Sequence, residues 1–418
     1  MLLRNLELKN IGPFKNVKLD FACDFSESEH PPVTIITGLN GSGKSIVIDA
    51  LRTALSGEKI ERDIVADRDN FSISVDFNSG DGFKKMTTQS FESGSIKCVD
   101  RPVSRALRIP YKRDEGIIFP WIVDYWSSRL PADSFVLNNM NRIDHYAFMA
   151  NVMVGRKHNV DLTNFLCNLD YMRSSDLKAE KETAEFLFAT VRKLIDRCLD
   201  NGKFLYIRRT DLMPTFEQNG QEVTLDKLSS GNIFLIEHLI LLVSKMYSLS
   251  IIRDTPTKDV LETPGLLLID EIETHLHPRW QKSILPIIRD TFPNLQIILT
   301  THSPFVLSSI RGARIYTCKP RPGYSTIEEE TYTYSSLPVD QILLSDAFNV
   351  APFNNTITQM LDSRKNAIYE GNQDEAKKIE AKLIDINPMY FSYLDDKKID
   401  DLLEKLKVMD DKVVGGDK

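Results

Sequence analysis

The chain opens with alternating apolar and polar residues and continues with short runs that are wholly apolar. Residues 3–9 alternate with a period of two, and a second such run follows at 17–21 after a turn, which predicts an N-terminal β-hairpin. Wholly apolar runs at 33–36, 266–269 and 296–299 are typical of strands buried on both faces. These runs predict a core sheet that is covered on both sides.

Apolar residues at helical spacing follow the first buried run at 46–55, precede the second at 231–249, and lie between the second and third at 279–289. Strand, helix and strand in this order indicate a parallel α/β core. The stretch 101–200 has little strand character, and its last part, 176–199, has the pattern of an amphipathic helix. We therefore expect a helical insertion in the core.

Four segments are predicted. The core comprises 1–100 and 201–335, the helical insertion is 101–200, and 336–418 forms a helical C-terminal extension rich in Lys, Asp and Glu. Short strand-like runs around a turn at Asn219 and Gly220 indicate that the chain re-enters the sheet after the insertion.

Composition narrows the class of protein. The 418 residues are 42% hydrophobic and 27% charged, as in ordinary globular proteins. The most apolar stretch, 233–243, contains Glu237 and His238, and the N-terminus lacks the pattern of a secretion signal. We expect a cytoplasmic protein without a membrane span. Five scattered cysteines indicate reduced thiols and no structural metal. The net charge of -7 argues against a surface coated by nucleic acid but leaves room for a local basic groove.

A glycine-rich turn joins the run 33–36 to the helix that follows. Turns that end in Gly-Lys-Ser between a strand and a helix direct backbone N–H groups at phosphate oxygens. Lys44 is expected to reach the β- and γ-phosphates of ATP, and the Ser45 hydroxyl is expected to bind Mg²⁺. The residues predicted to bind the nucleotide here are Gly38, Asn40, Gly41, Ser42, Gly43, Lys44 and Ser45.

Polar residues end the other two buried strands. Asp270 follows the run 266–269 and is expected to hold Mg²⁺, while Glu271 is the candidate that polarises the attacking water. His302 follows the run 296–299 and is placed to donate a hydrogen bond to the γ-phosphate. Lys44, Glu271 and His302 are therefore the predicted catalytic residues.

The segment Leu228-Ser229-Ser230-Gly231-Asn232 lies between the phosphate loop and the acidic strand. Alone it is a helix cap, because Ser is a preferred N-cap residue. In this order of motifs it resembles the signature of the ABC-type ATPase superfamily, with Ser230 at a position where the signature usually has Gly. The resemblance implies a P-loop NTPase with an ABC-type head, and a head-to-tail dimer in which Ser229, Ser230 and Gly231 of one subunit cap the ATP of the other.

The segments 270–281 and 300–304 resemble those of the soluble AAA-type branch related to OLD nucleases and to SMC and RecF heads. That resemblance implies that the loop with His275 and His277 crosses the dimer interface. A metal site at these two histidines is the weaker reading, because no third ligand stands at a known zinc spacing. A glutamine that touches magnesium is also implied, and Gln89 is the candidate.

ATPases of this shape resemble the sensor subunits of antiphage systems such as the Septu type, some of them beside retrons. The resemblance implies a separately encoded nuclease as partner. The C-terminal helices are then its docking surface, a brace of the dimer or a simple cover over the core. The alternative is a DNA-clamping repair or recombination ATPase of the RecF/SMC kind. Its candidate phosphate contacts are Arg101, Arg105, Arg108, Lys112 and Arg113. A transporter subunit and a non-hydrolysing scaffold are further alternatives.

Overall fold

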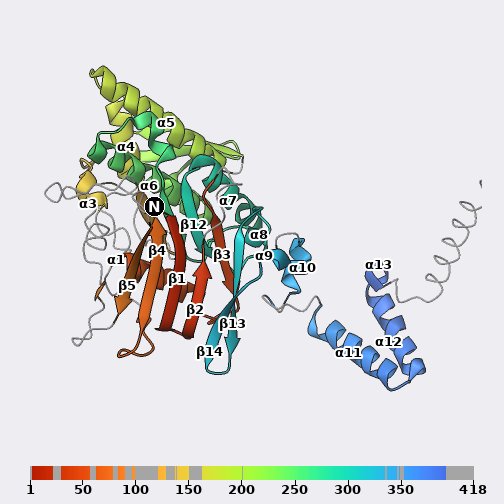
Figure 1. Cartoon of the computed structure of the whole chain (residues 1–418). Coiled ribbons are helices and arrows are strands. Elements are labelled where there is room, and N and C mark those ends of the chain that lie inside the picture. Colours follow the sequence, from red (N-terminus) through yellow and green to blue (C-terminus); the bar gives the residue numbers. More distant parts are fainter. Residues whose placement is uncertain are drawn as a thin grey trace, which may run out of the picture. The chain divides into compact units, whose positions relative to one another are not determined.

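A computed structural model of the protein describes residues 2–21, 30–56, 63–78, 83–89, 97–98, 121–128, 137, 139–149, 162–199, 201–334, 337–345, 348 and 353–391. The chain divides into two compact units, Met1–Leu343 and Leu344–Lys418 (Figure 1). The short helix α10 (Val339–Leu343), with its buried Ile342, belongs to the first unit.

The first unit is built on a six-stranded sheet with the order β14-β13-β3-β12-β11-β7. All neighbouring pairs are parallel except β13 with β14. Every residue of β3, β11 and β12 is buried. The mostly parallel core sheet predicted from the apolar runs is confirmed. The strands are β3 (Val33–Gly38), β7 (Ile122–Trp126), β11 (Gly265–Ile269), β12 (Leu295–Thr300), β13 (Arg314–Arg321) and β14 (Tyr324–Glu329).

Strand β7 corrects the prediction that 101–200 is helical throughout. It pairs in parallel with β11 and forms one edge of the core sheet. A charged residue, Asp124, lies buried in the middle of this strand and interrupts its apolar pattern. Its carboxylate is 2.5 Å from the buried ammonium of Lys245 and also accepts a hydrogen bond from the indole of Trp126. Because charged residues are rarely buried, a buried ion pair of this kind makes a core strand hard to predict from the apolar pattern.

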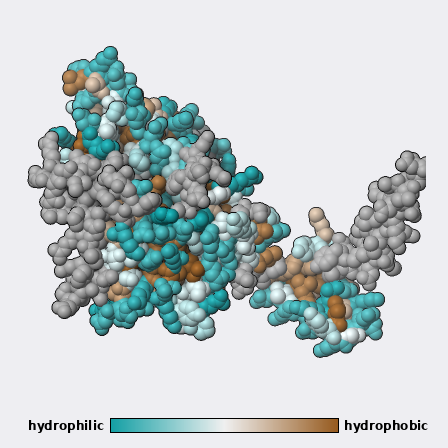
Figure 2. Space-filling model, viewed as in Figure 1, coloured by the Kyte–Doolittle hydropathy of each residue, from teal (hydrophilic) through white to brown (hydrophobic). Residues whose placement is uncertain are grey.

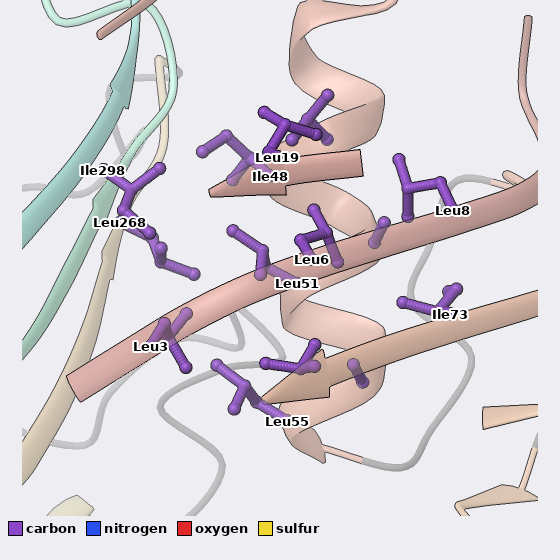
Figure 3. Packing of buried hydrophobic residues seen from close by; sticks show 14 of the residues in the cluster. Leu3, Leu6, Leu8, Leu19, Ile48, Leu51, Leu55, Ile73, Leu268 and Ile298 are labelled. Carbon is purple, nitrogen blue, oxygen red and sulfur yellow. The ribbon is translucent and has the colours of Figure 1, made fainter. Parts of the chain in front are cut away.

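A five-stranded sheet with the order β2-β1-β4-β5-β6 lies beside the core sheet, and the pairs given by the structure are antiparallel. The pairing of β1 with β2 confirms the N-terminal hairpin. Helix α1 (Lys44–Ser56) packs buried residues such as Ile48, Leu51 and Leu55 among Leu6 of this sheet and Leu268 of the core sheet (Figure 3). The strands are β1 (Leu2–Ile11), β2 (Phe14–Asp20), β4 (Ser72–Asn78), β5 (Phe83–Gln89) and β6 (Lys97–Cys98).

One buried glutamine joins the two sheets directly. The side-chain oxygen of Gln296 on β12 accepts from the backbone N–H of Leu3 at 2.7 Å, and its amide nitrogen donates to the Leu3 carbonyl at 2.9 Å. Both polar ends of the side chain are satisfied, so its burial carries no large desolvation penalty. Gln296 therefore fixes the register of β1 against the core.

A separate three-stranded antiparallel sheet, β10-β9-β8, follows the insertion. The expectation that these strands re-enter the core sheet is wrong, because their backbone partners are one another. Helix α5 (Lys178–Arg197) confirms the amphipathic helix predicted over 176–199 and lies with α4 at one end of this unit (Figure 1). The strands are β8 (Gly202–Arg208), β9 (Met213–Gln218) and β10 (Gln221–Thr224). The remaining α-helices described in this unit are α3 (His145–Met149), α4 (Leu162–Met172), α6 (Ser230–Arg253), α7 (Pro278–Thr291), α8 (Pro304–Leu307) and α9 (Thr331–Tyr334).

Helix α6 is longer than the run 231–249 that predicted it. By length and composition it is one helix of the described chain that is apolar enough to cross a membrane. Most of its apolar stretch is buried inside the protein, as in the core helix of a globular domain. Its apolar character is thus accounted for by packing.

The second unit contains α11 (Asn355–Tyr369), α12 (Gln373–Ile386) and α13 (Pro388–Phe391). Leu383 and Phe391 are fully buried in a small apolar cluster, and the guanidinium of Arg364 on α11 lies 2.7 Å from the carboxylate of Glu380 on α12. Apolar side chains are also exposed on this unit, Met389 and Tyr369 among them, and brown areas mark such surface in Figure 2. The described residues confirm a helical C-terminal extension. The aspartates at 395–396 and 400–401 lie outside the described residues.

Candidate nucleotide-binding site

The phosphate loop connects β3 to α1 with backbone geometry that only glycine adopts readily. Gly38, Gly41 and Gly43 have φ of +136°, +75° and +106°. A Cβ on Gly38 would lie 2.3 Å from the carbonyl oxygen of Cys318, and one on Gly43 would lie 2.6 Å from the Phe14 ring. The loop therefore requires glycine at these two positions both for its φ and for space.

Two side chains of the loop have polar groups suited to an anion. Lys44 is buried, and its ammonium donates to the Leu39 carbonyl at 3.0 Å. Burial lowers the pKa of Lys44, and the nearby Cys318, Glu271, Glu273 and Asp270 offset part of that effect. The Ser42 hydroxyl is fully buried and has no hydrogen-bond partner among the described residues. A buried orphan hydroxyl beside a buried ammonium at a helix N-terminus fits a phosphate group.

Asp270 and Glu271 stand at the carboxyl end of β11, next to β12. The Thr300 hydroxyl on β12 donates to Asp270 Oδ1 at 2.7 Å and accepts from the backbone N–H of Glu271 at 2.8 Å. The backbone N–H of Asp270 donates to the Trp126 carbonyl on β7 at 3.0 Å. Glu271 has φ of +52°, a left-handed conformation that is uncommon outside glycine. Contacts from strands on both sides thus hold this acidic turn in place.

His302 follows β12 and is half-buried. Desolvation, together with the charge of Lys44, lowers the pKa of His302 to about 4, and Asp270 acts in the opposite direction. The imidazole is therefore neutral at pH 7 and carries one N–H donor. The charges of Lys44 and Asp270 act on His302, which places the three side chains in one electrostatic neighbourhood at this edge of the sheet.

The order β3-β12-β11 brings most of the predicted site together. In a parallel sheet the carboxyl ends of neighbouring strands meet at one edge, where ligands of open α/β sheets bind. The phosphate loop, His302 and the pair Asp270 and Glu271 leave from these three ends. Ser45 is half-buried in the first turn of α1, and Asn40 is exposed on the loop.

The start of α6 contains Ser229, Ser230 and Gly231, whose contacts lie outside the phosphate loop. The Ser229 side chain caps α6, accepting from the backbone N–H of Asn232 at 3.2 Å and donating to Asn232 Oδ1 at 2.7 Å. A Cβ on Gly231 would lie 2.6 Å from the carbonyl oxygen of His275. Ser229 and Ser230 are exposed. The start of α6 is therefore packed against the loop that follows the acidic turn, with its two serines facing outward.

Gln89 ends β5 in the antiparallel sheet, where its backbone pairs with Ser72 and Lys97. Its side chain is not described, so its contact with magnesium stays a prediction. The basic residues at 101–113 lie outside the described residues as well.

His275 and His277 make contacts that shape the loop between β11 and α7. His275 has φ of +67° and lies near the Phe234 ring, while His277 Nδ1 accepts from the backbone N–H of Arg279 at the start of α7. Within the described residues no group of three His, Cys, Asp or Glu side chains could hold a metal ion.

Sequence reasoning missed two side chains of this site. Thr300 bridges Asp270 and Glu271, and the carboxylate of Glu273 accepts hydrogen bonds from the hydroxyl of Thr301 and the backbone N–H of His302. A threonine pair directly after an apolar strand and a second glutamate two residues after the first were the available signals. Neither signal shows which partner is contacted.

Residues 5–145 match the family described as "AAA domain", and residues 135–308 match the family described as "AAA domain, putative AbiEii toxin, Type IV TA system". The two matches overlap at residues 135–145 and together include the phosphate loop and both polar strand ends. Over these two ranges the chain is similar to AAA-type ATPase domains.

Relatives of this ATPase share parts of its length. The "Retron Vc95 probable ATPase" of Vibrio cholerae is 40% identical over 108 residues, which are 26% of this chain and 20% of that protein. The "Septu protein PtuA" of Bacillus mycoides is 23% identical over 91% of this chain and 49% of that protein. The "Retron Ec83 probable ATPase" of Escherichia coli is 28% identical over 43% of this chain and 32% of that protein. The chain thus spans half or less of the length of these three relatives.

Among solved structures, the "SMC head domain from Thermotoga maritima" is similar with a TM-score of 0.45 and 16% identity, over 79% of this chain and 99% of that one. The Smc head bound to the C-terminal winged-helix domain of ScpA gives a TM-score of 0.47 and 15% identity, over 79% of this chain and 98% of that one.

Proposed function

We propose that this ATPase binds and hydrolyses ATP, closes as a head-to-tail homodimer around two nucleotides, and acts as a switch for a separately encoded effector. The effector is a nuclease, and the setting is antiphage defence in the cytoplasm. The observation that carries the ATPase part is the gathering of the phosphate loop, Asp270, Glu271 and His302 at one edge of the parallel sheet.

The roles follow from the chemistry of each group. The backbone N–H groups of the loop, the Ser42 hydroxyl and the Lys44 ammonium hold the phosphates. Glu271 orients the attacking water and accepts its proton. Neutral His302 donates one hydrogen bond to the γ-phosphate, where negative charge collects as the bond to the leaving group breaks.

Ser45 and Asp270 are the side chains that would hold Mg²⁺, with Gln89 as a third candidate. The residues fit a hard cation, since they supply oxygen ligands, and the Thr300 hydrogen bond to Oδ1 orients the Asp270 carboxylate. Bound there, Mg²⁺ would neutralise negative charge on the phosphates.

The exposed start of α6 supports the dimer. A helix N-terminus with two outward serines is suited to the γ-phosphate of a nucleotide bound by another subunit, because its N–H groups and its dipole both favour an anion. Ser229, Ser230 and Gly231 of one subunit would thus complete the site of its partner. Higher homo-oligomers built from such dimers are compatible with this geometry.

The similarity to proteins named as retron ATPases and Septu protein PtuA supports the setting in defence. The C-terminal unit, with exposed Tyr369 and Met389, is the proposed docking surface for the effector. We thus expect two classes of partner, a nuclease and a nucleic acid. The nucleic acid would contact the nuclease or the ATPase itself.

Glu271→Gln tests the proposal. The substitution removes the base and keeps the shape of the side chain, so hydrolysis should fall by about 100-fold or more while ATP still binds. Light scattering with ATP and Mg²⁺ should then show a long-lived dimer. Affinity capture of this variant from its native host in ATP should recover a nuclease in fixed ratio.

Lys44→Ala is the matched control, because it should bind ATP much more weakly and should not form an ATP-dependent dimer. Rapid turnover by Glu271→Gln would refute the assigned base, and a monomer in saturating ATP would refute the dimer. Recovery of DNA alone, with turnover that DNA stimulates and salt weakens steeply, would instead establish the DNA-clamping alternative.

A further inference from the structure

A second carboxylate beyond the acidic turn holds the chain that carries His302. Glu273 Oε1 accepts from the backbone N–H of His302 at 2.5 Å, and Oε2 accepts from the Thr301 hydroxyl at 2.6 Å. Each carboxylate oxygen thus has its own donor from the end of β12. Hydrogen bonds to an ionised carboxylate are shorter and about twice as strong as neutral ones.

This contact lies in a largely buried place. Burial raises the pKa of Glu273, while the hydrogen bonds from Thr301 and His302 oppose that rise by stabilising the ionised form. An unpaired carboxylate would be costly here, so the two donors and the acid need one another. Removing Glu273 would leave the backbone N–H of His302 without this acceptor.

A second bridge joins the same two segments. The Ser303 hydroxyl donates to Gln281 Oε1 at 2.6 Å, and Gln281 Nε2 donates to the Leu276 carbonyl at 2.7 Å. The chain after β11 therefore holds residues 301–303 at three consecutive positions. These hydrogen bonds hold the main chain of His302, from which its imidazole extends.

We propose that Glu273 is a positioning residue that fixes the main chain of His302 and thereby sets where its imidazole stands relative to Lys44 and Asp270. The inference rests on the proposed ATP hydrolysis. Glu273 does not touch the reacting atoms in this role, and it acts through His302. A shift of about 1 Å in a group that contacts the transition state costs on the order of 100-fold in rate.

Glu273→Ala and Glu273→Gln separate positioning from other roles. The amide of Gln can accept from the His302 N–H through its oxygen and donate to the Thr301 hydroxyl through its nitrogen, so it keeps both contacts. We expect Ala to lower kcat by about 10- to 100-fold with KM for ATP within about twofold of the wild type, and Gln to restore most of kcat. Lys282→Gln, an exposed change on α7, is the control.

Amide hydrogen exchange of His302 in the nucleotide-free protein gives a readout that does not depend on turnover. The full chain labelled with ¹⁵N-histidine has seven candidate signals, and the one lost in His302→Gln identifies the residue. Exchange at His302 should be slow in the wild type and about 10- to 100-fold faster in Glu273→Ala. Glu273→Gln should remain slow, and the control should match the wild type.

Unchanged exchange at His302 in Glu273→Ala would overturn the inference, and so would faster exchange with kcat unaltered. Loss of kcat that Gln does not restore would also contradict it, since that pattern points to a need for the charge itself. If the wild type hydrolyses no ATP, the proposed function fails, and the exchange result still decides whether Glu273 holds His302.

Discussion

Helices α1 and α6 both begin at glycine-containing turns, and their N-termini are in opposite states. At the start of α1 the Ser42 hydroxyl is buried without a partner among the described residues, and Lys44 is buried beside it. At the start of α6 the exposed Ser229 caps its own helix through Asn232. A helix start with buried, unused donors is prepared for a ligand, whereas a self-capped one is stable without it. We therefore propose that phosphate binds first at the start of α1, and that the start of α6 adds the proposed intersubunit contact.

The largest expected effect comes from removing the lysine of the phosphate loop at the start of α1. Lys44→Ala removes a charge-assisted contact to phosphate, so ATP affinity should fall by about 10- to 100-fold and turnover should reach background. Isothermal titration with ATP measures the first and phosphate release the second. Ser230→Ala, in the exposed turn of α6, should leave binding to the isolated subunit unchanged. Equal losses of affinity in both variants would contradict the division between the two turns.

The packing of α6 against β7 should make the stability of the fold depend on pH, through His238 of α6. Burial lowers the pKa of His238 to about 4, and its ring packs on Phe234 of α6 and on Trp126 of β7. Its folded pKa lies below the unfolded value, so the unfolded chain binds the extra proton, and His238 destabilises the fold as pH falls from about 6.5 to 4. The shift corresponds to a loss of about 3 kcal/mol across that window.

His238→Phe should remove this contribution. Denaturant unfolding at pH 7 and pH 5 should then give a smaller difference for the variant than for the wild type. The variant should bind ATP at pH 7 with the affinity of the wild type. An identical pH slope in the two proteins would show that the folded protein does not hold His238 neutral.

Gly231→Ala targets the contact between α6 and the loop after the acidic turn. The added Cβ would lie 2.6 Å from the His275 carbonyl oxygen, so the loop must move, at a cost of about 1–3 kcal/mol. We expect a lower melting temperature, ATP affinity close to the wild type, and loss of the ATP-dependent dimer in light scattering. A dimer of unchanged stability would place the signature turn outside the interface.

The smallest effect belongs to the cap itself. Ser229→Ala removes the side-chain acceptor of the Asn232 N–H and should cost about 1 kcal/mol of stability. Ser229→Asp restores a capping acceptor and should regain that stability, yet its negative charge should oppose a partner's γ-phosphate. Thermal melts should thus show a loss of stability in Ser229→Ala only, whereas light scattering in ATP should show a weaker dimer in Ser229→Asp. Parallel changes in both measurements would mean that capping alone matters here.

The elements that hold the nucleotide edge could be read from sequence because their signals are local. Wholly apolar runs gave β3, β11 and β12, and the residues at their ends gave Lys44, Asp270 and His302. Parallel pairing then brings these ends together without further information.

What the sequence did not reveal depends on contacts between distant positions. Strand β7 was missed because Asp124 pairs with Lys245, 121 residues away. The three-stranded sheet was misplaced because local patterns do not tell which sheet a strand joins. The hold of Glu273 on the His302 N–H is likewise a tertiary contact, between residues 29 positions apart.

The place of β7 has a consequence for how such proteins diversify. Its last residue, Trp126, lies beside Ile269 and accepts the Asp270 N–H, so the chain leaves the core toward residue 127 from the same edge as the phosphate loop. Segments inserted after this strand can change in length and composition while the parallel register stays intact. Natural variation could therefore attach new recognition surfaces next to an unchanged catalytic edge, and a designer grafting a sensor segment would choose the same junction.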